Sequence, residues 1–170
     1  MALDVSRALK NPGQVYPFQA TLQIEPMEVL SDPVHFEDIA VEGEFFCTGE
    51  NRVSLRAKAD ARAVSRCCRC LERVETPVHA EIDAVYAKTP DPDDPDLYAF
   101  EANAIELTDA VRDALLLELP MQFFCKSDCK GLCPVCGANL NTVTCTCQEG
   151  KVITSPFSAL KSIVLNDEEV

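Results

Sequence analysis

Two stretches of strict alternation between apolar and polar residues lie in the middle of the chain. From Val53 to Ala63 the odd-numbered positions are apolar, and a matching alternation returns from Val74 to Tyr86. A period of two held over such lengths predicts half-buried β-strands. Because a short C-x-x-C corner separates the two runs, they predict a hairpin with this corner at its tip. The small alanines on the inner face indicate that a bulky element, a helix, packs against them.

Weaker strand patterns precede this hairpin. They cover residues 19–24, 35–39 and 41–48, and residues 49–51 (Gly-Glu-Asn) supply turn chemistry. The opening residues 3–17 are expected to form a short strand or turn that leads into a proline-marked loop.

One main helix is predicted in the second half of the chain. Thr108 suits its N-cap, and Val111 and Leu115 follow at helical spacing. Pro120 is expected to end it, because proline cannot donate to the helical ladder. A last short helix is expected over residues 157–164.

These patterns predict an α+β fold. We expect an antiparallel sheet of four to six strands, which can curl into a barrel-like shape, one main helix packed on it, and a C-terminal cysteine-rich zinc-binding lobe. The chain of 170 residues fits a single domain, residues 1–170. Residues 89–103 are expected to be an acidic, mobile loop within it, because prolines lack a backbone donor and the four aspartates repel one another.

Eight of the ten cysteines fall into closely spaced pairs. Two of them form the C-x-x-C corner, and residues 125–147 contain the other six. Thiolate pairs at such spacings are the usual way in which a chain holds structural zinc. The predicted ligands of one or two Zn²⁺ ions are Cys67, Cys70, Cys125, Cys129, Cys133, Cys136, Cys145 and Cys147.

The strongest single signal is the C-P-V-C-G motif at residues 133–137. Its proline shapes a tight turn and its glycine permits a positive φ at the close. Cys145 and Cys147 are its expected partners, and the other four predicted ligands would then staple the hairpin tip to the chain after the helix. A second partition, in which Cys129 joins the downstream group, stays open.

The remaining thiols and the alternative chemistries complete the interpretation. Cys47 is expected to be a small buried hydrophobe in a strand, and Cys68 lies between two ligands without an expected ligand role. The thiols also permit an iron–sulfur centre, or redox chemistry at Cys67 and Cys70. No nucleophile elbow, phosphate loop or H-E-x-x-H motif occurs in the sequence. No catalytic residue is therefore predicted, and the chain is not expected to be an enzyme.

The charge of the chain bounds its partners. Twenty-eight acidic against fifteen basic residues give a net charge of −13, which disfavours bulk electrostatic binding of nucleic acid. The first residues resemble no secretory signal, and no apolar run has the length of a membrane span. We expect a protein of the reducing cytoplasm, with neither a membrane nor a small-molecule substrate as its partner.

Two motifs carry a family resemblance. The chain resembles the YceD family of bacterial and plastid proteins in two segments. These are the C-x-R-C-L-E motif at residues 67–72 and C-K-S-D-C-K-G-L-C-P-V-C-G-A-N-L-N at residues 125–141. The resemblance extends over the acidic loop, the main helix and residues 156–160. It implies a role in ribosome biogenesis that supports accumulation of the 23S ribosomal RNA, without a known catalytic activity. Some relatives lack the downstream cysteine cluster, which favours two separate metal sites.

Basic residues gather around the hairpin, where seven of the fifteen lie within residues 52–73. If the hairpin pairs residues whose numbers sum to about 139, Arg56 faces Asp83 in an ion-pair ladder. Lys58 then faces Glu81. Alternatively, the bases form a patch for RNA phosphates. The predicted contacts with RNA or protein, nearest the tip, are Arg66, Arg69 and Arg73.

Two functional hypotheses follow. In the first, the protein is a zinc-stabilised binding module for large-subunit ribosomal RNA or for a basic ribosomal or assembly protein, and its net charge favours the basic protein. In the second, it is a metal- or dithiol-dependent redox enzyme that uses Cys67 and Cys70. Metal content and thiol reactivity distinguish the two.

Overall fold

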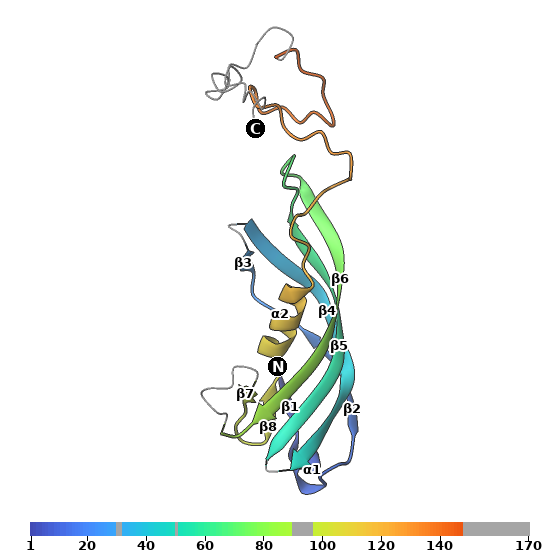
Figure 1. The fold of residues 1–170 in the computed structure, drawn as a ribbon, viewed down its shortest axis with the longest axis vertical. Coiled ribbons are helices and arrows are strands. Elements are labelled where there is room, and N and C mark those ends of the chain that lie inside the picture. The colour runs from blue at the N-terminus through green and yellow to red at the C-terminus, as the bar shows by residue number, and fades with distance from the viewer. Residues whose placement is uncertain (30–31, 50, 90–96, 148–170) are drawn as a thin grey trace, which may run out of the picture.

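The computed structural model describes residues 1–29, 32–49, 51–89 and 97–147. They form an elongated, strongly twisted sheet with one helix across its face and a cysteine-rich segment beyond one end (Figure 1). The strands are β1 (Ala2–Asp4), β2 (Tyr16–Leu22), β3 (Met27–Val29), β4 (Asp32–Gly49), β5 (Arg52–Arg66), β6 (Arg73–Ala87), β7 (Leu97–Ala99) and β8 (Ala104–Glu106). The helices are α1 (Ser6–Lys10) and α2 (Thr108–Leu117).

The main sheet has six strands in the order β2-β4-β5-β6-β7, and β3 also pairs with β4. All pairings are antiparallel except β6 with β7, while β1 and β8 form a separate two-stranded sheet. The expected strand number is confirmed, but the barrel-like closure is wrong: among the described strands the sheet is open. Closure requires the two edge strands to pair, and the three-residue β7 lies beside β6 only.

The β5–β6 hairpin has the register that the alternation predicts. Partners run from Arg52 opposite Ala87 to Arg66 opposite Arg73, so paired residue numbers sum to 139 throughout. The two expected strands at residues 35–39 and 41–48 are one strand, β4, with an irregularity in its pairing to β5 between Glu37 and Ala40. Asp38 has a φ of 53° there, which breaks the apolar–polar alternation locally.

The predicted main helix is α2, and it packs against β6 and β5. It buries Ala110, Val111 and Leu115, so the small inner face of the hairpin does accommodate a helix. The predicted cap is wrong by one residue: Leu107 is the N-cap, and the Thr108 hydroxyl donates to the Glu106 carboxylate instead of capping the helix. No helix in the described part of the chain is long and apolar enough to cross a membrane.

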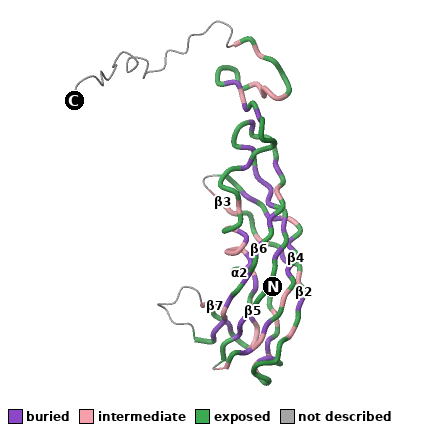
Figure 2. Tube along the Cα trace, turned by 45° about the vertical axis from the view of Figure 1, so that its right-hand side comes forward, coloured by how far each residue is buried: buried purple, intermediate pink, exposed green. Residues whose placement is uncertain are grey.

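The core lies between α2 and the inner face of the sheet. Alternate residues of β5 and β6 are buried over most of their length, which appears as regular bands along the trace in Figure 2. The largest of the fully enclosed side chains in the core are Tyr86, Ile39, Leu55, Ile105, Leu107 and Leu115. The hydrophobic contact that these side chains make fixes α2 on the sheet and with it the direction of the chain that follows.

Two further expectations, for the opening residues and for the acidic loop, differ from the structure. The opening residues 3–17 include helix α1, which the sequence pattern did not predict because only Ala8 of its five residues is buried. The expected acidic loop ends early: residues 97–99 form β7, and Phe100 is buried, its N–H donating to the Ala87 carbonyl at 3.1 Å. Residues 90–96 and the expected helix at 157–164 lie outside the described residues.

Candidate metal centres

The tip of the β5–β6 hairpin is a tight knuckle. The Cys67 N–H donates to the Glu72 carbonyl at 2.8 Å, and the Leu71 N–H donates to the Cys67 carbonyl at 2.9 Å. Leu71 closes the turn with a φ of 63°, in the left-handed region that side chains other than glycine seldom occupy. This geometry places the thiols of Cys67 and Cys70 side by side, and both are buried.

The chain after α2 returns to this tip and supplies two more thiols. The Cys68 N–H donates to the Phe123 carbonyl at 2.9 Å, which anchors the returning chain. The Cys67 and Cys129 Sγ atoms lie 3.9 Å apart, and those of Cys70 and Cys125 lie 3.5 Å apart. Four sulfurs around a tetrahedral zinc ion at about 2.3 Å would be about 3.8 Å apart. The first cysteine group (Cys67, Cys70, Cys125, Cys129) therefore fits such an ion.

A second cysteine group lies just downstream. The Cys133 N–H donates to the Ala138 carbonyl at 2.8 Å, and the Gly137 N–H donates to the Cys133 carbonyl at 2.9 Å. Gly137 has a φ of +73°, as the predicted knuckle requires. The ligand atoms of the second cysteine group all lie within 4.8 Å of one another; its members are Cys133, Cys136, Cys145 and Cys147.

The structure thus brings together the two sets of four that the preferred partition described, and Cys129 lies in the first. The groups differ in exposure: three of the four thiols are buried in the first group, whereas only Cys133 is buried in the second. Outside the groups, Cys47 is buried in β4 and Cys68 is exposed.

The thiols are unequal in acidity. Burial opposes ionisation of Cys67, but backbone N–H groups of Cys125, Arg69 and Cys70 outweigh it and lower its pKa to about 6. Backbone N–H groups of Cys136 and Val135 likewise lower the pKa of Cys133 to about 6.

Neighbouring thiols respond in the opposite direction. Burial, and then the nearby Cys129 and Cys70, raise the pKa of Cys125 to about 12. The contact with Cys136, and then burial, raises the pKa of Cys147 to about 11. Crowded thiols cannot all carry charge at neutral pH unless a cation offsets their repulsion. An all-sulfur tetrahedral donor set suits Zn²⁺, and it also suits iron in iron–sulfur proteins.

Two asparagines and a glutamate surround the groups and were not among the predicted site residues. The Asn141 amide donates to the Cys129 sulfur at 3.3 Å, and the Asn139 amide donates to the Glu72 carboxylate at 2.8 Å. All three residues belong to the motifs C-L-E and N-L-N that carry the family resemblance. Their place in these motifs was the available signal, but a sequence motif does not show which atoms its residues contact.

The three arginines predicted as contact residues have different surroundings. Arg69 is exposed, but its guanidinium lies along the returning chain: it donates to the carbonyls of Ser127 and Cys129 at 3.3 and 3.1 Å and covers the Phe124 ring. Arg73 pairs with the carboxylates of Glu37 and Glu75. Arg66 is exposed and forms no ion pair with any residue that the structure describes.

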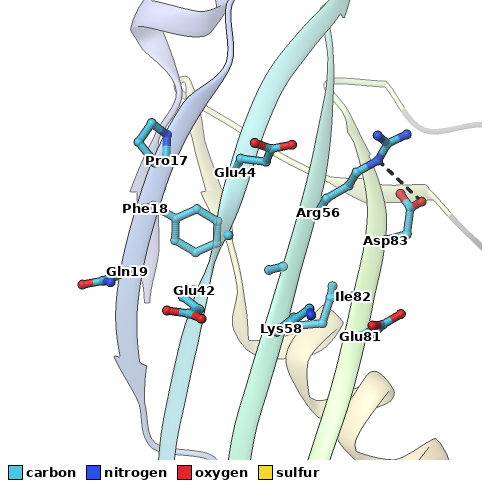
Figure 3. Close-up of a pocket in the computed structure, with 12 residues that line it drawn as sticks. Pro17, Phe18, Gln19, Glu42, Glu44, Arg56, Lys58, Glu81, Ile82 and Asp83 are labelled. Carbon is cyan, nitrogen blue, oxygen red and sulfur yellow. Dashed lines mark ion pairs between the residues drawn. The ribbon is translucent and has the colours of Figure 1, made fainter.

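Two bases farther down the hairpin, Arg56 and Lys58, lie beside a groove of about 910 Å³ across β2, β4, β5 and β6 (Figure 3). Each base has an acid on both sides, in the rows Glu44–Arg56–Asp83 and Glu42–Lys58–Glu81. Arg56 forms an ion pair with Asp83 at 3.8 Å. The registers therefore favour the charge ladder over an RNA patch at these positions.

Comparison with known proteins places these motifs in context. A family model described as large ribosomal RNA subunit accumulation protein YceD matches residues 55–164. The uncharacterized protein YlbN of Bacillus subtilis is 27% identical over 164 residues, which cover 93% of this chain and 93% of that protein. An uncharacterized protein of Mycobacterium tuberculosis is 28% identical over 149 residues, 82% of this chain and 70% of that protein.

A plant relative matches a shorter stretch. The large ribosomal RNA subunit accumulation protein YCED homolog 1, chloroplastic, of Zea mays is 42% identical over 60 residues, 35% of this chain and 20% of that protein. No solved structure matches the chain.

Proposed function

The chain belongs to the YceD family of large ribosomal RNA subunit accumulation proteins, and from this membership we propose that it is a non-catalytic, zinc-stabilised binding module that supports accumulation of 23S ribosomal RNA in the cytoplasm. The observation that carries the proposal is the pair of four-thiol groups at the end of the hairpin. Four protein ligands per ion leave no open coordination position, which is the arrangement of structural zinc and not of catalytic zinc.

Zinc in these groups would act on the fold. The first cysteine group joins the hairpin tip to the chain that follows α2, so a bound ion would cross-link segments 55 or more residues apart. In small finger peptides such binding contributes roughly 10–16 kcal/mol of apparent free energy to the folded state. The cysteine lobe, defined as residues 66–73 and 121–147, would thereby become a rigid end on a long sheet.

The charge distribution favours this lobe as the RNA contact. It contains five bases (Arg66, Arg69, Arg73, Lys126, Lys130) and two acids (Glu72, Asp128). Even with the −2 that each Zn(Cys)4 centre would add, the lobe would carry about −1, far less than the rest of a chain whose formal charge is −13. The acidic remainder would repel phosphates and orient the molecule lobe-first toward RNA. All three predicted contact arginines are exposed. We propose that Arg66 and Arg73 touch phosphates, while the Arg69 guanidinium is engaged by the carbonyls of Ser127 and Cys129 and supports the lobe.

Cross-linking in cells tests the partner. During large-subunit assembly the intact chain should cross-link to 23S ribosomal RNA, and Arg66→Ala should weaken that cross-link severalfold while leaving the melting temperature unchanged. Arg52→Ala is the matched control, because this exposed base lies at the opposite end of the same strand, about 45 Å away. Cross-links to a basic ribosomal protein alone, with none to RNA, would replace RNA by protein as the partner.

Metal analysis tests the zinc and the absence of redox chemistry. The purified protein should contain two tightly held zinc ions per chain and no rapidly alkylated thiol other than Cys68. A metal-free, folded protein whose Cys67 and Cys70 cycle reversibly through a disulfide would overturn the proposal in favour of the dithiol enzyme.

A further inference from the structure

A chain of side-chain hydrogen bonds links the segment between Cys136 and Cys145, which belongs to the second cysteine group, to the first cysteine group. The Asn139 amide donates to the Glu72 carboxylate at 2.8 Å, and the Asn139 oxygen accepts from both the N–H and the side-chain amide of Asn141 at 2.9 Å. The Asn141 amide also donates to the Cys129 sulfur at 3.3 Å, and its oxygen accepts from the Lys130 N–H at 3.0 Å. Asn139 and Asn141, which lie between Cys136 and Cys145, thus contact two parts of the first group. One is the ligand Cys129, and the other is Glu72, two positions after the ligand Cys70.

The backbone reinforces the same junction. The Leu132 N–H donates to the Arg69 carbonyl at 3.1 Å, and the Leu140 N–H donates to the Gly131 carbonyl at 2.9 Å. Gly131 has a φ of +73°, and a Cβ at this position would lie 3.0 Å from the Arg69 carbonyl oxygen. The chain at Gly131 and Leu132 therefore packs directly on the hairpin tip at Arg69. Only a small residue with left-handed backbone fits at position 131.

We propose that Asn139 and Asn141 are positioning residues that couple the two groups, so that a cation in either raises the affinity of the other. The inference rests on the proposed zinc binding. Residues 133–147 are held together by the second group, and without its cation Asn139 and Asn141 lose their fixed positions. The hydrogen bond to Cys129 and the bond to Glu72 then weaken together. The coupling is reciprocal by thermodynamic linkage, and weakening of these two hydrogen bonds without their complete loss corresponds to a factor of about ten.

The difference in exposure sets the order of loss. Cys136 is exposed and Cys145 and Cys147 are half-buried, whereas the first group is largely enclosed. A chelator therefore reaches the second group first, and the first group retains its ion longer while the bridge is intact.

Zinc release from the full-length, zinc-loaded protein tests the coupling. Native mass spectrometry would give the stoichiometry, and excess EDTA would give the release rate of each ion. Cys136→Ser should remove one ion and speed release of the remaining ion about tenfold. Asn139→Ala should speed release of the first-group ion by a similar factor. The double variant Asn139→Ala/Cys136→Ser should release this ion at nearly the same rate as Asn139→Ala alone. Val143→Ala, an exposed change in the same segment, is the matched control.

The outcomes separate this inference from the proposed function. Two ions that leave independently, with Cys136→Ser and Asn139→Ala acting additively on the first-group rate, would overturn the coupling and leave the zinc-stabilised module intact. A protein without zinc would overturn both. Should Asn139→Ala fail to fold, Glu72→Gln removes the acceptor charge with little change of shape; unchanged release rates in it would also overturn the coupling.

Discussion

The Sγ atoms of Cys70 and Cys125 lie 3.5 Å apart although 55 residues of chain separate them. The loop that they close contains β6, β7, β8 and α2. Constraining a loop of this length removes much of the conformational freedom of the unfolded chain. The first cysteine group is therefore placed to stabilise the whole domain, whereas the second group closes a short segment only.

Replacing a thiol of the first group should destabilise the whole domain. Cys70→Ser and Cys125→Ser are each expected to abolish cation binding at the first group. The free energy of unfolding should then fall by at least about 3 kcal/mol, because loss of a structural metal is one of the few causes of large destabilisation. Thermal denaturation followed by circular dichroism measures the change. Cys68→Ser, at an exposed thiol outside both groups, should leave the melting temperature unchanged. A Cys125→Ser protein that melts like the parent would contradict the long-range staple.

Gly43 is required by a close approach of two strands. An added Cβ would lie 2.5 Å from the Ala57 Cα and 2.6 Å from its Cβ, so β4 and β5 would have to separate. Gly43→Ala is expected to reduce the free energy of unfolding by more than about 2 kcal/mol, as overpacking against backbone does. Urea denaturation would measure it. Glu42→Ala, at the adjacent exposed position, should change it by less than about 0.5 kcal/mol.

Substitution of Arg69 should affect stability, whereas substitution of Arg66 should affect RNA contact. Arg69→Lys removes a planar donor that serves two carbonyls and covers the Phe124 ring. We expect a lower melting temperature and faster zinc release, since lysine cannot reproduce this geometry. Arg66→Ala should weaken RNA cross-linking severalfold at unchanged stability. The comparison fails if Arg69→Lys retains the melting temperature and zinc-release rate of the parent but loses RNA cross-linking.

Zinc retention should depend on pH through the thiols of lowest pKa. Cys67 and Cys133 have pKa values of about 6, below the ordinary thiol value of 9.0. A group whose pKa is lowered on folding stabilises the folded state above its unfolded pKa, and this contribution is lost as the pH falls through about 6. Protons compete with the cation for the same sulfurs in that range. Zinc content after dialysis should therefore be constant from pH 8 to 7 and fall as the pH passes below about 6.

The same acidities predict the protons released on zinc uptake. Because one thiol in each group is already ionised near neutral pH, each cation should displace fewer than four protons. Calorimetric titration in buffers of different ionisation enthalpy measures this number. Release of four protons per ion would contradict the lowered pKa values.

The strand hairpin shows how much of this protein local pattern could predict. Alternation over β5 and β6 determined both strands, their register and their inner face, because side chains on a strand point to opposite sides with a period of two. The Arg56–Asp83 pairing follows from that register alone. Helix α1 has too few buried residues to leave a periodic signal, and β7 lay inside a segment whose acids and prolines predicted a loop.

The sequence by itself determined which thiols exist in pairs and which chemistry they suit, since ligand type and short spacing are local properties. Only the tertiary structure decided which pairs meet, because the meeting of Cys67 and Cys70 with Cys125 and Cys129 depends on α2 packing against the sheet and directing the chain back to the hairpin tip. It also brought Arg69 to the Cys129 carbonyl and Asn139 to Glu72. These two contacts join residues that lie 60 and 67 positions apart along the chain. They arise from packing in space, which no local period encodes.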